Sequence, residues 1–288
     1  MNPALVALLA GATFIALSPI FVRLALDAGV GPTAAAFWRV ALAVPVLWIA
    51  YGFKRSPRPR RYSGKWLLLA GAGLAFAGDL AFWHTSIRLT SVANSTLLAN
   101  LASIFVTLAA WIFLRQRPCG LFLAGLVTAL AGVALLVHAS LRFSASGLAG
   151  DAFGVVTAMF YAAYLLAVKG LRDRGETTLH LMAVTSTITA MLLFPAALAS
   201  GDTLVPDSAR GWWILAGLAL VSHTAGQGLI AYALAHLPAA FSSVSLLFQP
   251  VMAALFAWLL LAEPLAPLQV AGGLIVLAGI YLARRGSA

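Results

Sequence analysis

One predicted helix carries a row of uncharged polar side chains inside an otherwise apolar stretch. Its members are separated by four, three and four positions, which places them on one helix face: Thr96, Asn100, Ser103 and Thr107. Serine and threonine on such faces commonly hydrogen-bond neighbouring helices in membranes. The Asn100 amide needs more partners than a hydroxyl, so we single it out as a candidate ligand for a substrate.

Two later segments carry the same kind of chemistry. Ser245 and Gln249 share a face with Ser242, and Pro250 follows directly. Because proline lacks a backbone N–H, Pro250 is expected to leave the carbonyl one turn earlier without its helical donor. That carbonyl could bind a substrate ammonium, or the proline could be a tolerated structural kink. Pro250 and Pro19 are the predicted hinges. In a further segment Gln227 shares a face with His223, and we count Gln227 among the candidate substrate ligands.

Asp79 is the only acidic residue in the middle of a predicted span. A carboxylate costs about 2.5–3.5 kcal/mol at the bilayer centre on insertion scales, so it needs a compensating environment. It could bind a proton or cation, contact a substrate amine, or pair with a polar neighbour. Trp83 follows on its face and His84 lies beside Trp83. All three residues are candidates for the substrate site.

Aromatic side chains offer a surface for an apolar substrate body. Tyr161 and Tyr164 lie three positions apart in one segment. Their hydroxyls need partners at mid-depth, which favours a cavity over lipid. Such a lining suits a molecule with an apolar or aromatic body and a small polar head.

Two basic residues, Arg23 and Arg39, are expected toward the ends of their helices. There they can extend toward water, with Asp27 as a partner for either. On this interpretation their role is structural. It also argues against a phosphorylated substrate, because phosphate should attract several basic residues into the core.

Motifs for enzyme chemistry are missing. The sequence has no H-E-x-x-H, G-x-S-x-G or P-loop motif, and no second mid-span acid for an aspartyl-protease pair. We therefore expect no catalytic residues, no metal ligands, no cofactor and no enzyme activity. The basic residues are clumped beside apolar segments, which favours membrane topology over nucleic-acid binding.

The elements that must position these residues are membrane spans. Apolar residues make up 62% of the chain and charged residues only 9%, against about 25% charged in soluble domains. Lipid must therefore be the main solvent. About 20 apolar residues cross a bilayer, which predicts ten spans: Ala4–Ala25, Ala34–Phe53, Trp66–Ile87, Ser91–Leu114, Cys119–His138, Ala152–Val168, Leu179–Ser200, Gly211–His236, Ala239–Leu261 and Pro267–Ala283.

The distribution of charge between the connections predicts the orientation. If the N-terminus is cytoplasmic, thirteen basic residues flank the spans on that side and only Arg88, Arg142 and Arg210 lie on the other. Cytoplasmic loops carry the excess of lysine and arginine. We therefore expect both termini in the cytoplasm and the protein in a bacterial-type inner membrane.

An internal repeat divides the chain. Shifting the sequence by 147 residues superimposes Ser91–Leu136 on Pro238–Ala283 without a gap, and Trp111 falls on Trp258. Each half, residues 1–141 and 150–288, would hold five spans, so the second half enters the bilayer upside down. The predicted fold class is an all-α membrane protein of two inverted five-helix repeats. Inverted repeats are typical of secondary transporters, whose site lies near the midplane.

Three motifs resemble the ten-helix EamA branch of the drug/metabolite transporter superfamily: Phe37-Trp38-Arg39, Leu260-Leu261-Ala262-Glu263-Pro264-Leu265, and Gly272-Gly273 followed by Leu277-Ala278-Gly279. The resemblance covers essentially the whole chain. Arg115-Gln116-Arg117 departs from the family pattern at the corresponding position of the first half. Within the family the chain is most similar to exporters of aromatic and other neutral amino acids, which implies a small-molecule substrate.

The predicted function is export by alternating access, with the substrate among spans 1, 3, 4, 6, 8 and 9. A multidrug or other metabolite exporter is the alternative. Asp79 is the one residue that supports export of a cationic drug, and a nucleotide-sugar carrier is disfavoured. A membrane scaffold is the alternative from a different class, because fold alone does not prove activity.

Overall fold

The computed structural model describes residues 2–54, 62–90, 92–138 and 147–287. Within these ranges almost the whole chain is helical and no strand occurs. Ten described segments are long and apolar enough to span a membrane: Pro3–Asp27, Pro32–Phe53, Lys65–Leu89, Asn94–Phe113, Gly120–Val137, Leu148–Asp173, Thr178–Ala199, Ala209–Ala233, Ala239–Leu261 and Pro267–Gly286. We number them as spans 1 to 10. They confirm the predicted fold class.

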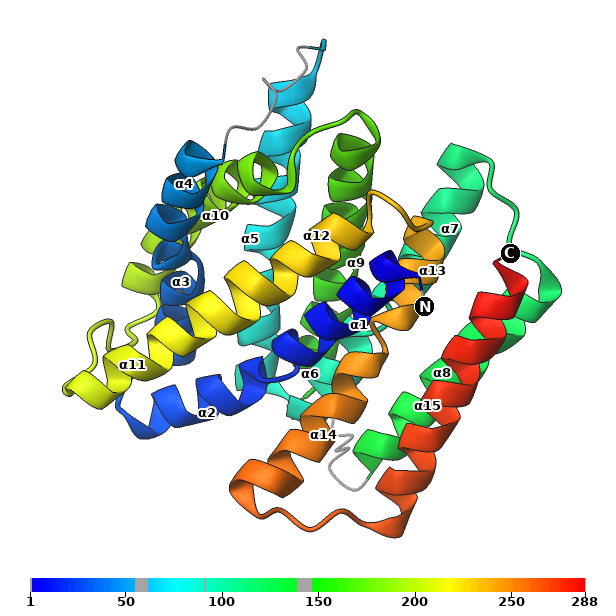
Figure 1. Ribbon diagram of the computed structural model, residues 1–288. Coiled ribbons are helices and arrows are strands. Elements are labelled where there is room, and N and C mark those ends of the chain that lie inside the picture. The colour runs from blue at the N-terminus through cyan, green and yellow to red at the C-terminus, as the bar shows by residue number, and fades with distance from the viewer. Residues whose placement is uncertain (1, 55–61, 91, 139–146, 288) are drawn as a thin grey trace.

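Half of the spans are single helices and half are interrupted (Figure 1). The single helices are α5 (Lys65–Leu89), α8 (Gly120–Val137), α9 (Leu148–Asp173), α10 (Thr178–Ala199) and α15 (Pro267–Gly286). The interrupted spans contain α1 (Pro3–Ile15) and α2 (Ser18–Asp27), α3 (Pro32–Ala41) and α4 (Ala43–Phe53), α6 (Val92–Ala99) and α7 (Ala102–Leu114), α11 (Ala209–Gly217), the π-helix η3 (Leu218–Gln227) and α12 (Gly228–Ala233), and α13 (Ala239–Ser245) and α14 (Phe248–Leu261).

The outer surface of the bundle is apolar. Leu67 and Phe113 expose 79% and 80% of their surface, and Trp213 exposes 78%. Large apolar side chains in such number on the outside would be unfavourable in water but match hydrocarbon. The chain is therefore a multi-pass membrane protein.

The internal repeat is visible in the backbone. Spans 4 and 9 both break in the middle, and both end with a non-glycine residue of positive φ, Arg115 at 55° and Ala262 at 54°. These two residues are separated by the 147 positions of the sequence repeat. A left-handed cap on a non-glycine residue is uncommon, so its recurrence at the repeat spacing links the two halves structurally. The boundaries 1–141 and 150–288 stay a prediction.

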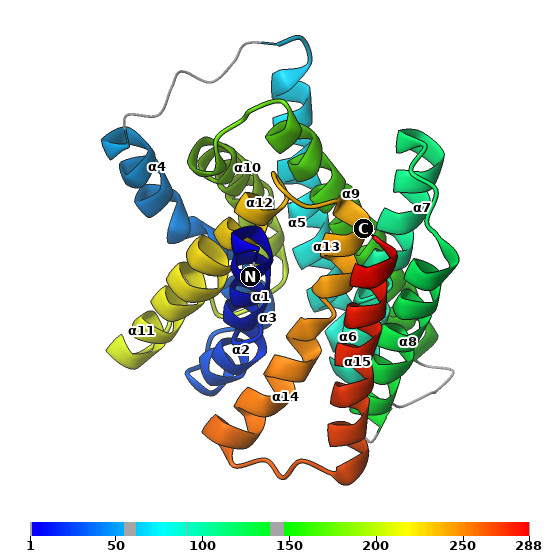
Figure 2. The same cartoon turned by 45° about the vertical axis from the view of Figure 1, so that its right-hand side comes forward.

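Spans 5 and 10 pack through glycines along their whole length, and Figures 1 and 2 both show α8 and α15 side by side at one edge of the bundle. A Cβ atom added to Gly272 would lie 2.7 Å from the backbone nitrogen of Leu136, and one added to Gly132 would lie 2.6 Å from that of Val276. Such backbone contact is the small-residue packing used by membrane helices.

We expect Gly272→Val to destabilise the bundle by about 1–3 kcal/mol, because the added side chain forces α8 and α15 apart. Gly71→Val is the matched control, since a Cβ there has nothing within 4 Å. Thermal unfolding of the detergent-purified protein, followed by size-exclusion chromatography, measures the difference. Equal melting temperatures for the two variants would contradict the packing argument.

Ionic contacts join the halves at both ends of the bundle. We call the end that holds Lys65 and Glu176 the basic-loop end, and the end that holds Asp202 the opposite end. At the basic-loop end the Lys65 Nζ lies 2.5 Å from Glu176 Oε2. At the opposite end Arg88 pairs with Asp202, and Arg23 pairs with Glu263.

The Arg23–Glu263 pair corrects one prediction. Asp27 was expected as the partner of Arg23, but the partner comes from the other half of the chain. The turn after α14 brings Glu263 to the exposed side of α2. Sequence proximity favoured Asp27, whereas the inverted repeat determines which helix ends meet in space.

Asp202 also holds the start of α3, since its Oδ2 accepts a hydrogen bond of 2.7 Å from the backbone N–H of Thr33. Burial alone would raise the pKa of Asp202, but the hydrogen bonds from Thr33 and the positive charge of Arg88 lower it overall. A carboxyl whose pKa is lower in the folded state stabilises the fold above its unfolded pKa of about 3.9. That stabilisation is lost as the pH falls through the folded-state value.

We therefore expect wild-type protein to lose about 1–2 kcal/mol more stability on acidification below pH 5 than Asp202→Asn, which has nothing to titrate there. At neutral pH the variant should melt at a lower temperature than wild type. Melting curves across a pH series check both points. The control is Asp207→Asn, an exposed carboxylate of the same loop. Parallel pH profiles for wild type and Asp202→Asn would refute this role.

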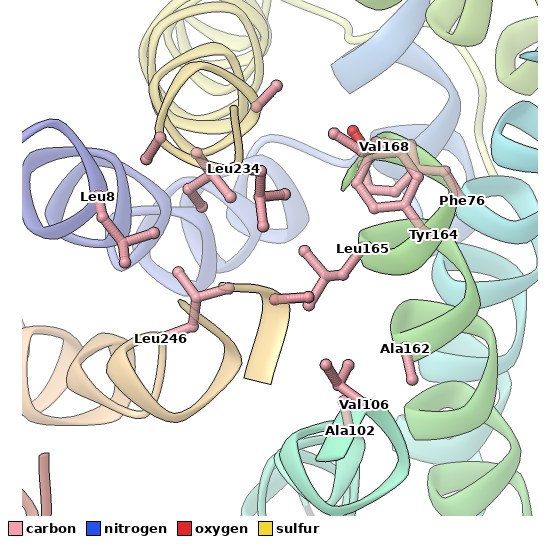
Figure 3. Packing of buried hydrophobic residues seen from close by; sticks show 14 of the residues in the cluster. Leu8, Phe76, Ala102, Val106, Ala162, Tyr164, Leu165, Val168, Leu234 and Leu246 are labelled. Atoms are coloured by element: carbon pink, nitrogen blue, oxygen red, sulfur yellow. The ribbon is translucent and has the colours of Figure 1, made fainter. Parts of the chain in front are cut away.

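A packed apolar region fills the basic-loop half of the interior. Figure 3 shows Leu8, Leu165, Leu234 and Leu246 pointing toward one another from α1, α9, the end of α12 and the end of α13. Leu8, Leu165 and Leu234 are at most 1% exposed. We call these four side chains the apolar seal. Three of them lie in the half of their spans that is nearer the basic-loop end, and Leu234 directly follows span 8 at that end.

Candidate functional site

A cavity of about 160 Å³ lies between the two halves of the bundle. Seven spans contribute to its wall, including the six predicted ones and span 2. Its lining residues are Ile15, Ala16, Ser18, Pro19, Arg39, Phe76, Asp79, Leu80, Trp83, Thr96, Ala99, Asn100, Thr157, Tyr161, Gln227, Gln249, Pro250 and Ala253. Drug-sized ligands occupy pockets of about 300–1,000 Å³, so this cavity suits a smaller molecule.

Interrupted helices form much of this wall. Span 1 breaks at Ala16 and Leu17, and span 9 breaks at Leu246 and Leu247. In each case a proline, Pro19 or Pro250, lies in the first turn of the following half-helix, where a missing N–H costs little. Irregular backbone at membrane depth is tolerated where it lines a cavity. Both predicted hinge prolines line the cavity, and their hinge role stays a prediction.

The carbonyl expected to be freed by Pro250 has a partner. Leu246 O accepts a hydrogen bond of 2.9 Å from the backbone N–H of Gln249. The helix tightens after the break and uses an i+3 donor where proline removes the i+4 donor. This corrects the expectation of a free carbonyl at that position.

Span 8 contains a π-helix of ten residues, Leu218–Gln227. π-helical segments inside membrane helices are often found at functional sites. Here the segment places the Gln227 side chain on the cavity wall. His223, one turn earlier, is turned away and contacts Ser186 Oγ at 2.8 Å through its Nε2.

Two opposite charges face the cavity. Asp79 comes from α5 and Arg39 from α3. The structure gives them no ion pair with each other and no hydrogen bond to another described residue. The Arg39 guanidinium lies 6.0 Å from the ring centre of Phe76, within range of a cation–π interaction.

The position of Arg39 corrects the sequence interpretation. Arg39 was expected at a helix end, but it is only 8% exposed and lies on the cavity wall. It is the eighth residue of α3, about two turns from the first. From that depth its side chain turns inward, where Phe76 and the charge of Asp79 compensate part of the cost of burial.

Six of the nine predicted ligands line the cavity: Asp79, Trp83, Asn100, Tyr161, Gln227 and Gln249. They come from five different spans, and Asp79 and Trp83 lie one turn apart on α5. Asn100 uses one amide N–H on Thr96 O at 2.7 Å. The structure thus brings together residues that are far apart in the sequence, although their role as ligands stays a prediction.

The other three predicted ligands lie behind the wall. The His84 Nδ1 lies 2.6 Å from Leu80 O, and Ser245 Oγ donates a 2.9 Å hydrogen bond to Phe241 O. Tyr164 is 1% exposed and lies against Tyr161, with ring centres 6.3 Å apart. Each has a helix-packing contact in place of cavity surface. They are not among the lining residues of this cavity, and their role as ligands stays a prediction.

The polar face of span 4 divides at the helix break. Thr96 in α6 and Asn100 just after α6 line the cavity, whereas Ser103 and Thr107 in α7 do not. The Thr107 hydroxyl donates to Ser103 O at 2.7 Å, and the Ser103 hydroxyl to Asn100 O at 3.0 Å. The part of this face that lies in α7 is therefore helix-packing surface.

Several cavity residues have an unused polar atom. Five lining side chains hold a buried nitrogen or oxygen without a hydrogen-bond partner in the described part of the chain: Ser18, Arg39, Thr157, Gln227 and Gln249. Buried polar atoms are nearly always paired in proteins. Their concentration on one wall makes this wall the candidate binding surface.

Ser18 and Thr157 were missed by the sequence interpretation, as were Arg39 and Phe76. Phe76 precedes Asp79 by three positions, so helical spacing could have identified it as a neighbour of Asp79 on the same helix face. Thr157 and Tyr161 are one turn apart on α9. Ser18 gave no signal, because a serine before a proline inside an apolar span usually indicates a kink.

A model of the EamA-like transporter family matches residues 2–138 and again residues 148–285. The chain belongs to the EamA-like transporter family. The two matches fall on the two halves of the chain and cover nearly all of it. The sequence prediction of this family, and of a transporter fold built from two repeats, is confirmed.

Named relatives of this EamA-like chain are transporters. An uncharacterised transporter of Archaeoglobus fulgidus is 29% identical over 91% of both chains. A probable terminal-alkyne amino-acid exporter of Streptantibioticus cattleyicolor is 29% identical over 92% of this chain and 87% of its own. The pseudopaline exporter CntI of Pseudomonas aeruginosa is 28% identical over 75% of each.

A solved structure shares the fold of this EamA-like chain. It superimposes with a TM-score of 0.80 over 99% of this chain and 98% of its own, at 17% sequence identity. At that identity the likeness concerns the arrangement of the helices alone. The chain is a transporter by family, and the substrate must be argued from the cavity.

Proposed function

We propose that this protein is a secondary exporter of small amphipathic amino acids, aromatic and other neutral ones, which works by alternating access. The observation that carries the proposal is the cavity between the halves. It combines aromatic rings of Phe76, Trp83 and Tyr161 with one acid and one base, Asp79 and Arg39. Such a wall suits a molecule with an apolar body and two opposite charges.

The names of two relatives support an amino-acid substrate. One is a probable terminal-alkyne amino-acid exporter and the other a pseudopaline exporter. At 28–29% identity these names support the direction of transport and the general class of cargo. The aromatic and neutral preference rests on the cavity lining and on the family resemblance.

The proposed cycle moves the halves against each other around the cavity. In this structure the four leucines of the apolar seal belong to one buried apolar cluster toward the basic-loop end. Opening of that end requires the four leucines to separate and the Lys65–Glu176 contact to part. Contacts at the opposite end, Arg23–Glu263 and Arg88–Asp202, join the same two halves and would have to part when that end opens.

The proposed location is a bacterial-type inner membrane with both termini in the cytoplasm, because the basic-loop end carries most of the lysine and arginine. In a Cys119-free background, Ser287→Cys should resist an impermeant thiol reagent in intact cells, whereas Val205→Cys at the opposite end should react. Ser56, the other predicted protected position, lies outside the described residues. Reversed labelling would invert the orientation.

A cationic-drug exporter is the second candidate function, supported by Asp79 alone. Arg39 on the same wall disfavours it, because an arginine repels a cation in a low-dielectric site. A nucleotide-sugar carrier is disfavoured as well, since one arginine is a weak match for a pyrophosphate. A scaffold would have no need for polar atoms without hydrogen-bond partners on the wall of a cavity.

Counterflow in proteoliposomes tests the proposal. Vesicles with purified protein are loaded with unlabelled L-phenylalanine, L-leucine, L-alanine or tetraphenylphosphonium, and uptake of the labelled compound is followed. Gln227→Leu, which should weaken binding while it keeps the helix, is the variant, and Gly71→Val the lipid-facing control. Exchange of phenylalanine or leucine supports the proposal. Exchange of tetraphenylphosphonium alone favours the drug exporter, and no exchange at all favours the scaffold.

A further inference from the structure

Arg39 is the least satisfied group of the cavity. Its guanidinium makes no hydrogen bond to a described residue, and its Nε is buried without a partner. Gln227 and Gln249 also carry unpaired amide nitrogens, but an amide can turn to present its oxygen. Guanidinium can only donate and stays charged in proteins. The wall therefore demands an acceptor, and an anionic one most of all.

Two half-helices begin at the cavity that Arg39 lines. The first turn of α2 contributes Ser18 and Pro19 to the cavity wall, and the first turn of α14 contributes Gln249 and Pro250. Ser18 Oγ of α2 and Gln249 Nε2 of α14 are buried without a hydrogen-bond partner among the described residues, so each can donate a hydrogen bond to a ligand in the cavity.

We propose that Arg39, with the Ser18 hydroxyl of α2 and the Gln249 amide of α14, binds a carboxylate of the transported molecule. This inference rests on the proposed function and narrows it to substrates with a free carboxylate. α2 belongs to the first half and α14 to the second, so one carboxylate would contact both moving parts. Amines, amides and esters of the same side chain would lack the group that the site requires.

A carboxylate fits the wall better than a phosphate. Asp79 faces the same cavity, and its negative charge would repel a phosphate dianion more strongly than a carboxylate. A single guanidinium also matches the two oxygens of one carboxylate in a forked geometry. Inorganic phosphate is therefore a useful competitor, with no effect expected.

The test compares compounds that differ only in the carboxylate. Binding of L-phenylalanine and L-phenylalaninamide, and of L-leucine and L-leucinamide, is measured by isothermal titration of the detergent-purified protein. Wild type should bind each acid at least about tenfold more tightly than its amide, the difference made by a charge-assisted hydrogen bond. Arg39→Gln should weaken binding of the acid by a similar factor and bring the acid-to-amide ratio near one.

Two further variants separate recognition from folding. Arg39→Lys keeps the charge without the fork and should restore part of the preference. Arg210→Gln removes an exposed arginine at the start of α11 and should leave the preference intact. A general loss of folding would lower binding of acid and amide together, and only loss of a carboxylate contact changes their ratio.

Equal binding of acid and amide by wild type would overturn the inference, even if Arg39→Gln cannot be purified. So would a preference that persists in Arg39→Gln, or full competition by inorganic phosphate. Wild type that exchanges phenylalanine and phenylalaninamide equally would refute this inference and leave the proposed function in place. Wild type that neither binds nor exchanges any amino acid would refute the proposed function itself.

Discussion

Glu176→Gln is expected to lower the free energy of unfolding by about 3–5 kcal/mol, the usual cost of leaving a buried charge without its partner. The Glu176 side chain is fully buried and that of Lys65 is 9% exposed. The carboxylate also contacts His180 Nδ1 at 2.8 Å through its other oxygen. Glutamine would keep the volume but leave the Lys65 ammonium buried and uncompensated. Thermal unfolding in detergent measures the loss.

The matched control is Asp173→Asn, which removes a carboxylate three residues away. Asp173 pairs with Lys169, but its side chain is 50% exposed, and exposed pairs contribute about 0–1 kcal/mol. The double variant Lys65→Met/Glu176→Leu removes both charges and should recover much of the lost stability. Glu176→Gln as stable as Asp173→Asn would show that water reaches the cluster and that burial is not its main feature.

The cluster also has a consequence for transport, because Lys65 lies in the first half and Glu176 in the second. If the basic-loop end must open in each cycle, the charge-free double variant should open more easily than wild type. A faster exchange rate in that variant, at unchanged substrate affinity, is therefore expected.

The fold could be predicted from the sequence because it depends mainly on the lengths of consecutive apolar segments, which can be read along the chain. Hydrocarbon thickness sets the length of each apolar segment, so the number of spans can be counted from the apolar segments of about 20 residues in the sequence. The repeat spacing of 147 residues likewise appears as matched tryptophans and again as the paired caps Arg115 and Ala262. Long helices need no information on distant partners to be recognised.

The cavity was only partly predictable. The sequence indicates how deep in the membrane a residue lies, but not whether its side chain points toward the cavity or toward a neighbouring helix. Asn100, Gln227 and Gln249 were recognised because uncharged amides in a span need partners. Arg39 was misplaced because two turns of depth allow either an outward or an inward side chain, and the ring of Phe76 decides between them. His84, Tyr164 and Ser245 fit the polarity rule but find partners within their own surroundings. Which neighbouring helix each of these side chains meets depends on the packing of the bundle, and a polarity rule along one helix does not contain that information.

Asp79→Asn is expected to abolish the response of transport to an imposed pH gradient. The Asp79 carboxylate faces the cavity without an ion pair or hydrogen bond to a described residue. A carboxylate in such a site can be neutralised by a proton or by a substrate ammonium, and each excludes the other. Binding of an amino acid would then release a proton, and the two would move in opposite directions. Asparagine keeps the size and the hydrogen bonding but holds no exchangeable charge.

The measurement uses proteoliposomes with purified wild type or variant and labelled L-phenylalanine. A gradient of one pH unit stores about 1.4 kcal/mol per proton, enough for about tenfold accumulation by the wild type. Asp79→Asn should exchange phenylalanine at high concentration, with an affinity weakened at least about tenfold by loss of the charged contact. It should show no accumulation when the gradient is applied. Ser245→Ala is the control, because that hydroxyl bonds to Phe241 O behind the cavity wall.

The outcomes separate three roles for Asp79. Wild-type transport that ignores the pH gradient would remove proton coupling altogether. A variant that keeps the pH response but loses affinity would make Asp79 a ligand for the ammonium and place the coupling elsewhere. A variant that melts well below wild type would make Asp79 a structural partner of Arg39 across the cavity. In that last case Arg39→Gln/Asp79→Asn, which removes both charges, should be more stable than Asp79→Asn, because no unbalanced charge then remains in the low-dielectric interior.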